Sequence, residues 1–251
     1  MPTIGLLYPG SSAEDDFPGL ERRLDTDLRL PVVRTSVGED AHRVDALLDL
    51  GSTERLAEGA RTLVAEHRPD SIMWACTSGS FVFGWQGAHD QVRELQARTG
   101  VPTSSTSLAF VEACRALSVE RVSVAASYPR DVAEHFVAFL DRGGIAVTAL
   151  GSHGIVTAAE VGTLGYEQVE AIATGADVSG GAEAVLVPDT AMHTLQWIDK
   201  LEAAVGCAEQ RAQHVVARDV ADELDPLPYR DLVGGEHGQP DGGFQLVDPL
   251  Q

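Results

Sequence analysis

The sequence predicts an α/β protein with two parallel-sheet lobes and an active site in the cleft between them. Short apolar runs alternate with amphipathic helical stretches along most of the chain, a pattern typical of a parallel sheet covered by helices. The second half also opens on residues that resemble the opening of the first half. Two similar lobes place the carboxyl ends of their strands at a shared cleft, where such folds bind ligands.

The expected elements follow one another in a regular order. The expected strands are the short apolar runs Ile4–Tyr8, Leu30–Val33, Ser71–Ala75, Val122–Ala126, Ala146–Leu150 and Ala184–Val187. The expected helices carry apolar residues at helical spacing and are Glu54–His67, Asp90–Thr99, Leu108–Leu117, Val132–Arg142, Tyr166–Thr174 and Leu195–Val205. A polar loop is expected at 104–107 and a charged first helical turn at 14–16.

Two pairs of segments suggest that the lobes arose by duplication. The segment 4–11 resembles 122–130, since each leads from an apolar run into a Tyr-Pro pair. The segment 71–77 likewise resembles 184–190, which sets Cys76 opposite Asp189. The alternative is that all strand–turn–helix units look alike. Duplication gives an N-terminal lobe at 1–115, with part of the C-terminal helices crossing over to it, and a C-terminal lobe at 116–224. The remainder, 225–251, is an irregular acidic tail rich in Gly and Pro.

Composition excludes several classes of partner and cofactor. The net charge is −20 with no basic stripe, so nucleic acid and anionic membrane are poor partners. No apolar run is long enough to span a bilayer, and no signal peptide is recognisable. The three cysteines are odd in number and widely spaced, as in a reducing compartment, which predicts a cytoplasmic protein. Lys200 is the only lysine and lies in a polar helical stretch, which argues against pyridoxal phosphate. Nucleotide and zinc-protease motifs are missing, so we expect neither cofactor nor metal.

Cys76 is the candidate catalytic residue. It ends an apolar run and precedes Thr77, Ser78 and Gly79, where a helix N-terminus is expected to lower the thiol pKa. The same hydroxyls and N–H groups suit a substrate carboxylate or an oxyanion. The alternative is a buried core cysteine, which is how we interpret Cys114.

Asp189 is the second candidate, because it occupies the position equivalent to Cys76. Its alternative role is a helix N-cap. The other loops at strand ends supply candidate substrate-binding hydroxyls, at Tyr8, Ser11, Ser12, Thr77, Ser78, Tyr128 and Thr190.

These motifs resemble a known family. The segments 4–16, 74–80 and 187–191 are similar to the maleate cis-trans isomerase and arylmalonate decarboxylase branch of the aspartate/glutamate racemase superfamily, which includes ectoine-utilisation relatives. The resemblance covers roughly residues 3–205 and implies two flavodoxin-like lobes related by pseudo-twofold symmetry. It also implies no cofactor and a homo-oligomer. Cys76 matches a family cysteine that acts as nucleophile or in proton transfer, and Tyr128 matches a carboxylate-binding tyrosine.

The sequence departs from the family pattern at two of its motifs. Ser12 stands where the family has asparagine, and Asp189 stands where it has a second cysteine. Two adjacent ionisable groups share a proton, so either Asp189 donates a proton while Cys76 attacks, or Asp189 activates the thiol as a base. We therefore predict an isomerase or racemase of a small carboxylic or dicarboxylic acid. The alternatives are an arylmalonate-type decarboxylase and a non-catalytic carboxylate-binding relative.

Overall fold

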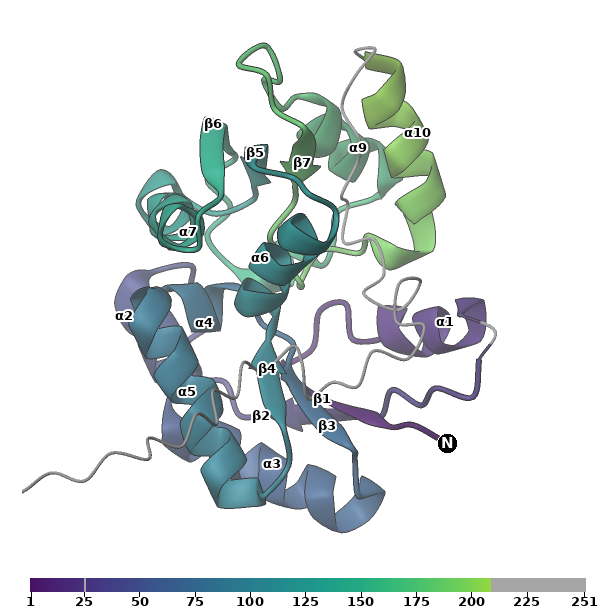
Figure 1. The fold of residues 1–251 in the computed structure, drawn as a ribbon, viewed down its shortest axis with the longest axis vertical. Coiled ribbons are helices and arrows are strands. Elements are labelled where there is room, and N and C mark those ends of the chain that lie inside the picture. Colours follow the sequence, from purple (N-terminus) through teal and green to yellow (C-terminus); the bar gives the residue numbers. More distant parts are fainter. Residues whose placement is uncertain (25, 209–251) are drawn as a thin grey trace, which may run out of the picture.

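Two parallel sheets form the framework of the molecule, one in each half of the chain. The computed structural model describes residues 1–24 and 26–208. Figure 1 shows the N-terminal half in the lower part of the view and the C-terminal half above it. Helices connect the parallel strands within each sheet, as expected for a βαβ arrangement.

The N-terminal sheet has the strand order β2-β1-β3-β4. Its strands are β1 (Ile4–Pro9), β2 (Val32–Thr35), β3 (Ser71–Trp74) and β4 (Thr103–Ser105). Every pairing is parallel. The first strand is buried through most of its length, because it pairs on both edges and carries apolar residues on both faces.

The C-terminal sheet repeats this arrangement in the order β6-β5-β7. Its strands are β5 (Arg121–Ala126), β6 (Ala146–Ser152) and β7 (Ala184–Leu186), again all parallel. In both sheets the first strand lies between the second and the third. The central position of the first strand is also that of flavodoxin-like folds. The predicted two-lobed α/β fold is confirmed, and β3 and β7 occupy equivalent positions, as duplication requires.

Helices connect the strands in every case. They are α1 (Asp16–Arg23), α2 (Val44–Leu50), α3 (Thr53–His67), α4 (Ser78–Phe81), α5 (Gly84–Thr99), α6 (Thr106–Ala116), α7 (Arg130–Arg142), α8 (Ala158–Val161), α9 (Tyr166–Thr174) and α10 (Ile198–Ala208), which a 3-10 turn, η1 (Leu195–Trp197), precedes. The six predicted helices are present. Four more, α1, α2, α4 and α8, have at most eight residues each, too few for a periodic pattern to stand out.

The expectation of a polar loop at 104–107 is wrong, because these residues belong to β4 and α6. Ser105 ends β4 and caps α6, because its side chain accepts a hydrogen bond from the Leu108 N–H. A strand of three residues that is rich in Ser and Thr lacks the apolar run by which strands are recognised. The charged first turn is present in part, since Asp16 begins α1.

The largest core cluster joins the two lobes. Phe81 from α4 contacts the rings of Tyr128 and Phe136 at centroid distances of 5.7 and 5.2 Å. Phe110 from α6 packs on Phe136 at 5.5 Å. Aromatic packing of this kind makes the interface part of the core. The predicted tail, 225–251, lies outside the described residues. No helix in the described part of the chain is long and apolar enough to cross a membrane.

Candidate active site

A cavity of about 180 Å³ lies where the carboxyl ends of the two sheets meet. The residues that line it come from the end of β1, from the segments that follow β1, β2, β3 and β7, and from the helices α2, α4 and α8. They are Tyr8, Pro9, Gly10, Ser11, Ser12, Val37, Asp40, Ala41, His42, Leu47, Leu50, Cys76, Ser78, Ala158, Asp189, Thr190 and Ala191. Cys76 from one lobe and Asp189 from the other therefore share one cavity.

Cys76 is buried in this cavity and is held from one side by backbone. The Gly79 N–H donates a hydrogen bond to Sγ at 3.3 Å, and the Ser78 hydroxyl lies 3.8 Å from Sγ. Burial nevertheless raises the pKa of the thiol to about 12, and the negative charge of Asp189 adds to this effect. The expectation of a lowered pKa is wrong, because desolvation outweighs the hydrogen bonds of a four-residue helix.

Gly79, whose N–H contacts the Cys76 sulfur, is held in place by two further side chains. Its carbonyl accepts hydrogen bonds from Trp74 Nε1 at 3.3 Å and from Gln91 Nε2 at 2.9 Å. Gln91 Nε2 also donates to the Gly51 carbonyl at 2.7 Å. A Cβ atom at Gly79 would lie 3.1 Å from the Cys76 sulfur. Only glycine fits here without a shift in the surrounding residues, and the sequence alone did not reveal Gln91.

Asp189 accepts hydrogen bonds on both of its carboxylate oxygens. Ser127 donates to Oδ2 through its hydroxyl, and the Ala191 N–H donates to Oδ1 at 2.9 Å. Asp189 is buried, and no helix begins at the next residue, so it forms a local turn rather than a helix cap. An ionised carboxylate accepts only, and two donated hydrogen bonds suit that form.

Tyr8 and Thr190 join the lobes at the edge of the cavity. The Tyr8 hydroxyl donates to the Thr190 carbonyl at 3.0 Å and accepts from the Ala13 N–H at 3.0 Å. The Thr190 hydroxyl donates to the Ala75 carbonyl at 3.1 Å. Burial raises the pKa of Tyr8 well above its usual value, so the phenol stays protonated.

The two serines that follow β1 differ in their surroundings. Ser12 donates to the Ala158 carbonyl at 3.3 Å, whereas Ser11 is exposed at the rim.

Two predicted substrate-binding residues do not line the cavity. Thr77 is fully buried, and its hydroxyl has no hydrogen-bond partner among the described residues. Tyr128 is also fully buried, and its hydroxyl donates a hydrogen bond to the Pro188 carbonyl. In this structure Tyr128 therefore supports the segment that carries Asp189, and neither residue contacts the cavity.

The sequence did not reveal Asp40 or His42, which reach the cavity from the loop between β2 and α2. Asp40 accepts hydrogen bonds from the Ala158 and Ala159 N–H groups at 2.9 and 3.0 Å. His42 Nδ1 lies 2.8 Å from the Ile155 carbonyl. Both residues follow a short strand in a polar stretch, where nothing in the residue pattern distinguishes a site residue from a surface one.

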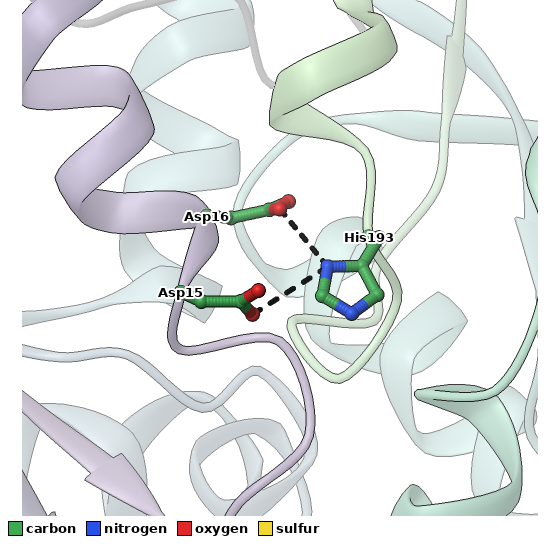
Figure 2. A group of neighbouring side chains, drawn as sticks. All are labelled: Asp15, Asp16 and His193. Carbon is green, nitrogen blue, oxygen red and sulfur yellow. Dashed lines mark hydrogen bonds and ion pairs between the residues drawn. The ribbon is translucent and has the colours of Figure 1, made fainter.

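Outside the cavity, a cluster of Asp15, Asp16 and His193 connects the two lobes. Asp16 accepts a hydrogen bond from His193 Nδ1 at 2.9 Å (Figure 2). It also accepts hydrogen bonds from the N–H groups of Thr194 and Leu195, both at 3.1 Å. Asp15 lies farther from the same imidazole, at 3.8 Å. The carboxylate of Asp16 thus caps the start of η1 from a distant part of the chain, which is a structural role.

Comparison with known proteins agrees with this description. Residues 44–216 match the model of the arylmalonate decarboxylase family, and the chain therefore belongs to this family of two-lobed enzymes. This confirms the resemblance inferred from the motifs.

Individual relatives include maleate isomerases from two organisms. Maleate isomerase from Nocardia farcinica is 27% identical over 88% of this chain and 90% of its own length. A variant of the N. farcinica maleate cis-trans isomerase with a covalently bound succinylcysteine intermediate superposes with a TM-score of 0.72, at 25% identity over 82% of this chain and 85% of that one. The maleate isomerase of Pseudomonas putida S16 shares the fold, with a TM-score of 0.70 and 20% identity over 81% and 85% of the two chains.

Proposed function

We propose that this protein is a cofactor-independent cis-trans isomerase of a small unsaturated dicarboxylic acid such as maleate. The observation that carries the proposal is that Cys76 and Asp189, from different lobes, are both buried and line one cavity. Sites for drug-sized ligands measure roughly 300–1,000 Å³, so a cavity of about 180 Å³ suits a smaller acid. A relative that carries a succinylcysteine intermediate supports thiol addition as the chemistry.

The resting state pairs a neutral thiol with a carboxylate. Burial holds the pKa of Cys76 at about 12, and Asp189 receives two hydrogen bonds. Of the two roles that the sequence left open, this arrangement supports Asp189 as the base. Asp189 accepts the thiol proton as the sulfur attacks, which removes the need for a permanent thiolate.

The addition is reversible and balanced. The sulfur lone pair forms a C–S bond to one alkene carbon, and the alkene electrons take the proton from Asp189 at the other carbon. The resulting single bond rotates. Asp189 then removes a proton from the same carbon, the C–S bond breaks, and the sulfur recovers its proton as the trans acid leaves. Backbone N–H groups and the hydroxyls of Ser11, Ser12 and Ser78 are the proposed carboxylate contacts.

A decarboxylase is a second candidate, favoured by one wall of the cavity. The cavity lining includes apolar side chains, at Val37, Ala41, Leu47, Leu50 and Ala158, which suit an apolar substituent. Loss of CO₂ from an arylmalonate would require oxyanion stabilisation at the same site, with protonation of the carbanion by Cys76.

Turnover assays in deuterium oxide separate these functions. We expect the wild-type protein to convert maleate to the trans acid and to incorporate solvent deuterium, because the transferred proton exchanges with water. Cys76→Ser should lose at least about 10²-fold in rate, because a hydroxyl is a much weaker nucleophile, while circular dichroism stays unchanged. CO₂ release from an arylmalonate without action on maleate would favour the decarboxylase. Wild-type turnover of neither acid, with saturable binding of both, would identify a carboxylate-binding protein.

Three finer properties complete the proposal. Racemisation of an α-substituted acid is a side activity to test in the same assay. A cytoplasmic location is supported by the free thiols of Cys76 and Cys114, since reducing compartments preserve thiols. The homo-oligomer rests on the family resemblance, and light scattering of the purified protein tests it.

A further inference from the structure

We infer that His42 binds one carboxylate of the substrate and so determines specificity for a dicarboxylic acid. The inference rests on the proposed function and adds a residue to it. Among the described residues that line the cavity, none is Lys or Arg. Two acidic residues, Asp40 and Asp189, also line the cavity. A dianionic substrate therefore enters a site where His42 is the one lining side chain able to carry positive charge.

The hydrogen bonding of His42 fixes which ring nitrogen is left for a ligand. A carbonyl oxygen only accepts, so the contact of 2.8 Å with Ile155 requires that Nδ1 carries the hydrogen. No residue that the structure describes forms a hydrogen bond with Nε2. Nε2 is therefore free for a ligand, and in the cationic imidazolium it donates a hydrogen bond to a carboxylate while Nδ1 keeps its own.

Packing holds the imidazole in this orientation. His42 is only 7% exposed. Its ring packs edge-on against Tyr128, at a centroid distance of 4.9 Å and an interplanar angle of 87°. The His42 N–H also donates to the Val156 carbonyl at 2.7 Å. A side chain fixed by its backbone, its ring and its Nδ1 atom loses little conformational entropy when it binds a ligand.

The loop that carries His42 bridges the two lobes at this point. Asp40 holds the N-terminus of α8, two residues before His42 contacts Ile155. The imidazole is thus placed by both lobes, like Cys76 and Asp189, and it belongs to a different strand end from either of them. This places a recognition group apart from the two reacting groups, as selection of a second carboxylate requires.

Affinity measurements in an inactive background test the inference. We expect Cys76→Ser protein to bind maleate, measured by calorimetry, and addition of His42→Asn to weaken that binding at least tenfold. Asparagine can keep a donor to the Ile155 carbonyl while removing Nε2. An unsaturated monocarboxylate that lacks the second acid group should lose little affinity in the same variant. His67→Asn, at the end of α3 and away from the cavity, is the matched control and should bind as before.

Kinetics in the otherwise wild-type enzyme give the second readout. His42→Asn should raise KM for maleate more than it lowers kcat, and His42→Gln should recover part of the loss, because its amide reaches toward the Nε2 position. Unchanged KM and affinity in His42→Asn, with normal wild-type turnover, would overturn the inference and leave the proposed function standing. Failure of both wild-type turnover and Cys76→Ser binding would overturn the proposed function and the inference with it. If His42→Asn does not fold, His42→Ala, which also lacks Nε2, carries the same comparison.

Discussion

At the level of single residues, burial and hydrogen bonding act on Cys76 in opposite directions. Desolvation raises the pKa of the thiol, while the Gly79 N–H and the Ser78 hydroxyl lower it, and desolvation is the larger effect. The thiol is therefore neutral until a base takes its proton. In this account the base is Asp189, which makes the reactivity of Cys76 depend on substrate rather than on a permanent thiolate.

Alkylation of the free protein tests this state of the thiol. The rate with iodoacetamide at Cys76, followed by peptide mass spectrometry, should rise about tenfold per pH unit from neutral pH to pH 10, because only the thiolate reacts. The rate should increase with pH because the pKa of the thiol is raised to about 12. The thiolate fraction therefore still increases throughout the range from neutral pH to pH 10. A rate that levels off near neutral pH would show a lowered pKa and contradict the account.

Asp189 and Asp16 form a matched pair of buried carboxylates with different predicted roles. Asp189→Asn should lower kcat at least about 10²-fold, because an amide cannot accept the thiol proton, with little change in unfolding temperature. Asp16→Asn should leave kcat near normal, because Asp16 does not line the cavity. Asp16→Asn should instead lower the free energy of unfolding by about 1–3 kcal/mol, because it weakens the charge-assisted hydrogen bonds that Asp16 accepts. Near-normal turnover in Asp189→Asn would show that this position carries no chemistry.

At the level of elements, α4 and α5 hold the segment that contains Cys76. Gly79→Ala should reduce kcat at least about tenfold, because a Cβ atom would lie 2.9 Å from Leu50 Cδ2 and 3.1 Å from the sulfur and from Trp74, and small displacements of reacting groups are costly. Gly19→Ala in α1 is the control, since its Cβ would meet nothing nearer than 4.0 Å. Steady-state kinetics should show the loss of kcat in Gly79→Ala but not in Gly19→Ala, and thermal unfolding checks that both variants are folded. Full activity in Gly79→Ala would mean that the Gly79 N–H does not position the thiol.

The sequence predicts those elements whose apolar pattern is long enough to read. Helix α7 buries Val132, Ala133, Phe136, Phe139 and Leu140 at helical spacing, and its expected range, Val132–Arg142, needed only two more residues at the start. Strand β4 and helix α4 have three and four residues, too few for any period. The same limit applies to the site. Cys76 and Asp189 stand at recognisable strand ends, whereas Gln91 and His42 reach it through long-range packing that a linear pattern does not encode.

At the level of the whole molecule, the site exists only where the two lobes meet. The hydrogen bonds from Tyr8 to Thr190, from Thr190 to Ala75 and from Ser12 to Ala158 all join residues more than one hundred positions apart. The core cluster around Tyr128 crosses the same boundary. The two reacting groups are thus fixed relative to each other by the interface itself. Two similar lobes, one carrying Cys76 and the other Asp189, give two chemically different faces to a single cavity.

The central claim is that Cys76 adds to the substrate while Asp189 moves the proton. Its most direct measurement is peptide mass spectrometry of protein quenched with acid during incubation with maleate. In the wild-type protein we expect an adduct equal in mass to one maleic acid on the Cys76 peptide, and this adduct should be missing in Cys76→Ser. In Asp189→Asn the adduct should form at least about 10²-fold more slowly, because the amide cannot accept the thiol proton. A wild-type enzyme that turns over maleate without this adduct on Cys76, or an Asp189→Asn variant that forms it at the wild-type rate, would contradict the account.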